Sequence, residues 1–388
     1  MVIYPYYAIM FSERSHLSTA QISALFGWWI IVALISELPT GTLADKFSRR
    51  TVIIFSDIFQ ALAFFIWLIA PNFLGYALGF LFWGIGFAFS SGALQAYVFD
   101  EMKALHETKL FTKVYSRSQS MSFAGMVCAY IVASIMGQRY EVALVLSIVI
   151  SLASAYVAST FPKSSQAREA HGAKPSQMQV LKKAVQEVSS SKLLQRLVMA
   201  VAVSVAIGSA MEEYVPLYDK VVGVPIRVVP LVLALGLGLS SVFAWVAHHF
   251  ESRTRLFGLI SLAIAGFTLY WTSFESTIIA VGGIMLFMRL VKLSSLLYQS
   301  SLQHHVGEES RATVGSLPTF LSEILSLLIV GVYGFVARSH GNFASIRTVA
   351  LGVVVASLLL AWFWRNYSLT VERVEQSVAD SPEIGLSA

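Results

Sequence analysis

Long runs of apolar residues recur along the whole chain, and short segments with charged, Gly or Pro residues separate them. Most runs reach the length of about 20 residues that a helix needs to cross a bilayer. The first run is too short to span, and we expect the given start to lie inside that helix. The pattern predicts helices over 1–12, 19–42, 51–70, 73–98, 114–136, 141–161, 193–217, 228–249, 255–273, 276–302, 312–337 and 343–365.

A long polar stretch in the middle of the chain divides these helices into two sets of six. We expect an N-terminal bundle over 1–162, a cytoplasmic linker over 163–192, a C-terminal bundle over 193–366 and a mobile polar tail over 367–388. Inside the linker, four apolar residues recur at helical spacing, as in an amphipathic helix at a membrane surface: Met178, Leu181, Val185 and Val188. A frayed linker without this helix is the alternative.

The composition agrees with a chain that lies mostly in lipid. Hydrophobic residues make up 56% of the sequence and charged residues 13%, with a mean hydropathy of +0.70. Soluble domains carry about 25% charged residues, and disordered chains are more polar still. We therefore expect an all-α membrane protein with twelve transmembrane helices. The net charge of +5 is scattered over many loops, which excludes a nucleic-acid surface, and the lone Cys128 excludes an intrachain disulfide.

The distribution of Lys and Arg predicts the orientation in the membrane. Of the 27 such residues, 19 lie in the loops and ends of one side, two lie inside a span, and six lie on the other side: Arg14, Arg139, Lys220, Arg227, Arg338 and Arg347. Because cytoplasmic loops are rich in Lys and Arg, we expect both termini and the linker to be cytoplasmic. A bacterial inner membrane is the expected location.

One loop carries a recognisable motif. The segment Gly41-Thr42-Leu43-Ala44-Asp45-Lys46-Phe47-Ser48-Arg49-Arg50 joins the second and third predicted helices. It resembles the G-x-L-a-D-[RK]-x-G-[RK]-[RK] signature of the major facilitator superfamily (MFS). A weaker copy, 247–253, follows the eighth helix and shares Ala, Phe and the final Arg. The resemblance implies two six-helix bundles of parallel topology with the substrate site between them.

The resemblance also implies a latch between the bundles on the cytoplasmic side. Gly41 would allow close helix approach, and Asp45 would contact the start of the eleventh helix near Arg311 to Thr313. Its negative charge suits the positive end of a helix dipole. Arg49 or Arg50 would pair with Asp100 at the end of the fourth helix. Ser48 stands where the family has Gly, and the alternative is a loop that is basic only because it is cytoplasmic.

Two departures from the family's drug exporters make a typical multidrug antiporter a weaker match. The fourth helix reads Phe82-Trp83-Gly84-Ile85-Gly86 without an Arg, and the fifth lacks the G-P-x-x-G-G run. Small residues at i, i+4 spacing, such as Gly236, Ser240 and Ala244, are interpreted as a helix-packing seam.

Charged residues inside the spans are candidates for the site, since such charges are costly in lipid and usually face a cavity. Arg289 and Lys292 lie three residues apart on one face of the tenth helix. Three acids lie in the eleventh and seventh helices: Glu323, Glu212 and Glu213. The functional interpretation has the cations bind an anionic substrate while Glu323 or Glu212 carries a proton. The alternative is a structural ion pair. Glu37, in the second helix, is a weaker candidate. An ion pair between Glu37 and the basic cytoplasmic loop would explain its presence equally well.

These observations predict a secondary transporter rather than an enzyme, because no Walker-type or hydrolase motif occurs. We expect it to move a small organic solute, anionic or carboxylate-bearing, by alternating access coupled to protons. The alternatives are an efflux pump for hydrophobic or cationic compounds and a non-transporting membrane sensor of the same fold. The expected partners are the solute, a coupling proton and the lipid bilayer. We expect a monomer with no cofactor or metal.

Overall fold

The apolar runs fold as helices in the computed structural model. It describes residues 1–44, 48–90, 93–162, 177–274, 278–306 and 311–379. Side chains are described within these ranges except at 37–44, 177–181, 184, 248, 251–252, 278, 311–313 and 366–379. The α-helices are α1 Tyr7–Arg14, α2 Thr19–Ala44, α3 Arg49–Ile69, α4 Phe73–Ser90, α5 Ala93–Ala104, α6 Phe111–Met136, α7 Tyr140–Ser159, α8 Gln177–Ser190, α9 Lys192–Glu212, α10 Val215–Val221, α11 Val229–Ala247, α12 Thr254–Thr272, α13 Ile278–His305 and α14 Arg311–Ala379.

The predicted spans correspond to these helices, with three local differences. The run predicted as 73–98 contains two helices, α4 and α5. The seventh span ends at Glu212, and α10 follows it with Pro216 in its first turn, a position that needs no backbone N–H. The two last spans lie in α14 on either side of Gly341, whose φ of +79° interrupts the helix. The prediction of an all-α membrane fold is confirmed.

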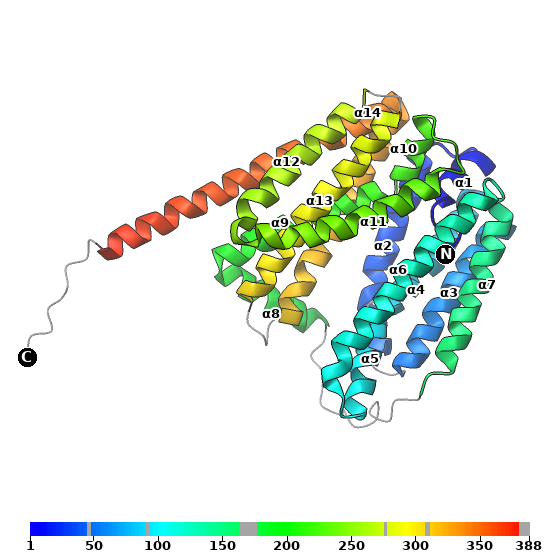
Figure 1. Cartoon of the computed structure of the whole chain (residues 1–388), viewed down its shortest axis with the longest axis horizontal. Coiled ribbons are helices and arrows are strands. Elements are labelled where there is room, and N and C mark those ends of the chain that lie inside the picture. Colours follow the sequence, from blue (N-terminus) through cyan, green and yellow to red (C-terminus); the bar gives the residue numbers. More distant parts are fainter. Residues whose placement is uncertain (45–47, 91–92, 163–176, 275–277, 307–310, 380–388) are drawn as a thin grey trace, which may run out of the picture.

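Parts of the polar linker and of the polar C-terminal tail are helical. The predicted linker helix forms as α8, but it packs against α9 and α14 and buries Val188 in the main core. Lys182 and Lys183 face outward from it. The helix α14 continues past the predicted end at 365 to Ala379, and its red end extends away from the bundle in Figure 1.

The two halves of the chain form two bundles (Figure 1). In the N-terminal half, α3 packs against α4 and α7, and α4 against α2. In the C-terminal half, α9 packs against α13 and α14, and α12 packs against the same two helices. Among the described residues, the main helix pairs that join the halves are α2 with α14, α6 with α11 and α1 with α10. A site between the halves is therefore bordered by helices of both.

Polar and aromatic contacts join the halves at the end of the molecule where α1 and α10 lie, which we call the α10 end; α5 and α8 mark the opposite α5 end (Figure 1). Tyr214 donates a hydrogen bond to Ser23 at 2.8 Å. Lys220 forms an ion pair with Glu13 at 3.1 Å. Ser134 donates to the carbonyl of Arg227 at 2.7 Å. The α10 end is therefore closed.

The segment of α6 from Ser120 to Gly125 is exposed around its circumference. Met121 and Phe123 are 72% and 55% exposed, and Ser120, Ser122 and Gly125 are exposed as well. A helix in a packed interface would bury one face. Both the lipid side and the side toward the other half are therefore uncovered, and the halves separate toward the α5 end.

Candidate functional site

A group of charged residues lies where the two halves face each other. Arg289 and Lys292 project from α13, and both positive charges act electrostatically on Glu212 at the end of α9. Lys292 and Glu212 are exposed although they belong to membrane-spanning helices. The structure thus brings together three of the residues that the sequence singled out.

Arg289 is held by the backbone of α11. Its Nη1 donates to the carbonyl of Gly236 at 2.5 Å, and Ser240 Oγ donates to the same carbonyl at 3.1 Å. A Cβ at Gly236 would lie 3.7 Å from Nη2 of Arg289, an ordinary contact distance, so the guanidinium lies directly against this face of α11. The predicted packing seam of α11 therefore also positions a cation. Within the described residues, Nε of Arg289 is buried without a hydrogen-bond partner.

The acidic end of α9 lies close to tyrosines of the N-terminal half. The charges of Glu213 and Glu212 act on Tyr4, and the charge of Glu212 acts on Tyr130 of α6. Tyr4 begins a row of aromatic rings: it packs edge-on against Trp83 with centroids 6.3 Å apart, and Trp83 in turn contacts Trp29 at 6.5 Å. Sequence reasoning missed Tyr130, because a tyrosine in an apolar span carries no signal of its own.

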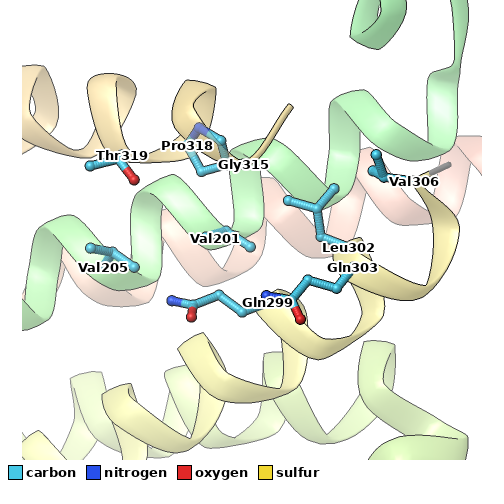
Figure 2. A pocket seen from close by; sticks show the side chains of 9 residues that line it. All are labelled: Val201, Val205, Gln299, Leu302, Gln303, Val306, Gly315, Pro318 and Thr319. Atoms are coloured by element: carbon cyan, nitrogen blue, oxygen red, sulfur yellow. The ribbon is translucent and has the colours of Figure 1, made fainter. Parts of the chain in front are cut away.

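Glu323 is half-buried in α14, where this helix packs against α9. Ser326, one turn further on, donates to the carbonyl of Ala206 at 3.3 Å and lies 2.9 Å from Ser209 Oγ. Thr319, one turn before Glu323, lines a cavity of about 210 Å³ between α9, α13 and α14. Figure 2 shows Gln299 and Gln303 of α13 extending beneath α9 in this cavity.

The motif loop has a described part within the N-terminal half. Arg49 forms an ion pair with Asp100 at 2.5 Å, whereas Arg50 donates to the carbonyls of Ser159 and Phe161 at the end of α7. Ser48, which replaces the family's Gly, caps α3 by accepting from the Thr51 N–H at 3.2 Å.

The remaining motif contacts lie outside the described residues. This applies to Asp45, to the surroundings of Gly41 and Glu37, and to the side chain of Arg311. The predicted contact between the halves at this loop therefore stays a prediction.

In the described parts of the chain, no group of three or more His, Cys, Asp or Glu side chains could hold a metal ion. His305 lies beside the carbonyl of Ser301, with Nδ1 2.7 Å from the oxygen. His249 packs against the ring of Trp245.

Two helical bundles, joined at one end and surrounding exposed charges within the membrane, define a polytopic transport protein. The sequence model of the Major Facilitator Superfamily matches residues 1–330. The chain belongs to this superfamily, and it is a transporter rather than an enzyme. The resemblance of the motif loop is thereby confirmed.

Solved structures with the same fold include several transporters. A point mutant of the nucleoside transporter NupG aligns with a TM-score of 0.75 and 15% identity, covering 94% of this chain and 96% of that one. A D-xylose-proton symporter aligns with a TM-score of 0.68 and 15% identity, covering 92% of this chain and 94% of that one. A bacterial homologue of the human lysosomal transporter Spinster aligns with a TM-score of 0.69 and 15% identity, covering 94% of this chain and 92% of that one. A search of curated proteins finds no match.

Proposed function

We propose that the chain is a proton-coupled secondary transporter that moves a small carboxylate-bearing solute by alternating access. The observation that carries this proposal is the charged group on α13 and α9: Arg289, Lys292 and Glu212. The two positive charges on one face of α13 exceed the single negative charge of Glu212. The buried Nε–H of Arg289 also has no hydrogen-bond acceptor within the described residues. A carboxylate of the solute supplies both the missing charge and the missing acceptor.

Competition between the solute and Glu212 for these cations would couple solute binding to proton binding. A bound carboxylate would share Arg289 and Lys292 with Glu212, and the weakened attraction would make protonation of Glu212 easier. Glu212 would then release its proton when the solute leaves. Glu323, half-buried one turn from the cavity of α14, is the alternative proton carrier.

The charge bias of the loops gives the proposed orientation. The α5 end carries Lys182, Lys183 and Arg49, so it faces the cytoplasm by the positive-inside rule. The closed α10 end then faces outward, and the solute site communicates with the cytoplasm in this conformation. The location is the cell membrane, and the transporter acts as a monomer with both termini inside.

The test compares exchange and accumulation of radiolabelled carboxylate solutes in proteoliposomes. Glu212→Gln should still exchange solute across the membrane but fail to accumulate it against a gradient, since no proton is carried. Arg289→Ala should weaken solute binding at every pH. Glu107→Gln changes an exposed carboxylate outside the spans and serves as the control.

Each alternative outcome has a distinct meaning. Normal accumulation by Glu212→Gln together with its loss in Glu323→Gln would move the proton to Glu323. Normal accumulation by both variants would refute coupling through these acids. Absence of transport of any solute would favour the membrane sensor.

The aromatic row favours one second candidate, an efflux pump for hydrophobic or cationic compounds. Trp29 extends the row to Phe87 at 5.6 Å, and Glu212 and Glu213 lie near its start at Tyr4. Aromatic faces and acids together suit organic cations. In that case Arg289→Ala would leave transport of the cation unchanged or raise it, whereas the carboxylate proposal predicts a loss.

A further inference from the structure

A buried acid lies in the short helix α10, outside the membrane-spanning helices. Asp219 is 0% exposed, and neither carboxylate oxygen has a hydrogen-bond partner within the part of the chain that the structure describes. Its backbone carbonyl accepts from the Val224 N–H at 2.9 Å and so ends the helix. The sequence offered no sign of this burial, because Asp219 lies between two predicted spans.

Contacts of Tyr218 and Lys220 with other helices hold α10 in place at the closed end. The adjacent Tyr218 donates to the carbonyl of Thr272 in α12 at 2.7 Å and packs against Phe343 of α14. The next residue, Lys220, forms the ion pair with Glu13 of α1. Asp219 thus lies between two residues that tie α10 to other helices, one of them across the two halves.

The charged residues of α1 and the neighbouring Lys220 are paired with groups other than Asp219. On α1, Glu13 pairs with Lys220, and Arg14 pairs with Glu141 of α7 at 3.3 Å. The helix α11 carries no titratable side chain. Other titratable groups that flank α10 in the sequence or lie on the elements packed against it include Tyr7, Glu212, Glu213, Tyr214, Tyr218, Arg227, Tyr270, Tyr333, Arg338, His340 and Arg347. Burial alone raises the pKa of Asp219 to about 7.

We infer that Asp219 is a proton-binding site that makes closure of the α10 end dependent on pH. A carboxylate with no partner in a dry environment is costly in its charged form, so the closed end holds the neutral acid. Opening must separate Lys220 from Glu13 and admit water to α10. The carboxyl group then ionises as an ordinary Asp.

The sign of the effect follows from the two states. The closed end binds the proton more tightly, so acid favours closure, and this preference is lost as pH rises through about 7. Between the pKa of an ordinary Asp, about 4, and about 7 the ratio of closed to open molecules should fall about tenfold per pH unit, and above about 7 it should stay constant. The proton enters and leaves at the α10 end, so it is not carried across the membrane. The inference rests on the proposed alternating access and not on the solute or on Glu212.

The experiment measures the width of the α10 end without substrate. Spin labels are attached to cysteines at the exposed positions Arg139 and Val228, one in each half, in a Cys128→Ser background. Distances are recorded from pH 5 to pH 9. The short-distance population should be largest at pH 5, decline as the pH rises to about 7 and stay constant from there to pH 9. Asp219→Asn, which resembles the neutral acid, should keep the short distance at every pH.

Lys220→Gln is the matched control in the same helix. It removes a contact between the halves but leaves Asp219, so it should lower the short-distance population and keep the pH dependence. A pH-independent wild type would overturn the inference, as would an Asp219→Asn variant that keeps the wild-type pH dependence. If Asp219→Asn does not fold, Asp219→Glu replaces it, and an unchanged midpoint would count against the site. Failure of the proposed function would show only in the transport assays, since the distances are measured without solute.

Discussion

Gly334 of α14 is the position where a single methyl group should open the α10 end. A Cβ built there lies 2.6 Å from the Cβ of Ser23 in α2, across the interface of the two halves. Ordinary carbon–carbon contacts are about 3.5–4.0 Å, so Gly334→Ala creates an overlap of about 1 Å. Both partners are close to helix backbone, and neither can turn away. The two helices must separate for the methyl group to fit.

The overlap gives the expected magnitude. Overpacking of a close interface costs about 1–3 kcal/mol. If the open state relieves this cost, the ratio of closed to open molecules falls by about 5- to 150-fold, because about 1.4 kcal/mol corresponds to a factor of ten. Alanine also favours the helix by about 1 kcal/mol over glycine. That gain applies to both states and does not shift the ratio.

The assay is the distance between spin labels at Arg139 and Val228, with the long-distance population expected to rise in Gly334→Ala. Gly331→Ala, one turn earlier on the same helix, is the control, since a Cβ there meets nothing within 4 Å. Adding Ser23→Gly to Gly334→Ala should restore closure by making room. Adding Ser23→Ala should not, because it keeps the Cβ and removes only the hydroxyl group, which accepts from Tyr214 and donates to the carbonyl of Thr19.

Two results would refute this reasoning. If Gly334→Ala and Gly331→Ala give the same distances, close approach at Gly334 does not hold the α10 end closed. If Ser23→Ala alone opens the end as far as Gly334→Ala does, the hydrogen bond rather than the packing is the decisive contact.

Three further predictions concern other parts of the molecule. A cysteine at the exposed Lys183 of α8, in a Cys128→Ser background, should resist impermeant maleimide in intact cells, and labelling from outside would reverse the proposed orientation. Asp100→Asn should lower the free energy of unfolding by less than about 1 kcal/mol, since both it and Arg49 are partly exposed; a larger loss in chemical denaturation would contradict this. Gly137→Ala should lower the thermal midpoint, because φ is +62° there and a Cβ would lie 2.7 Å from the Arg227 side chain; an unchanged midpoint would show that this turn relaxes freely.

The sequence alone determined the class of the fold and its division into halves. Span length and loop charge are local properties, and a bilayer permits few structures other than helices for such a chain. The motif loop identified the superfamily because its Gly, Asp and paired Arg occur together at fixed spacing. The charged candidates Arg289, Lys292 and Glu212 were visible because charges stand out in apolar spans.

Only the tertiary structure decided how these residues are used. The sequence left Arg49 and Arg50 equivalent, but the end of α7 engages Arg50 through its carbonyls and leaves Arg49 for Asp100. The sequence indicated only a helix-packing role for Gly236, whereas in the structure its carbonyl accepts a hydrogen bond from Arg289. Asp219 had no signal at all, since burial depends on neighbours distant in the chain that close over α10. The hydrogen-bond partners and the burial of a side chain depend on contacts between helices. The residue pattern along a single helix therefore does not predict them.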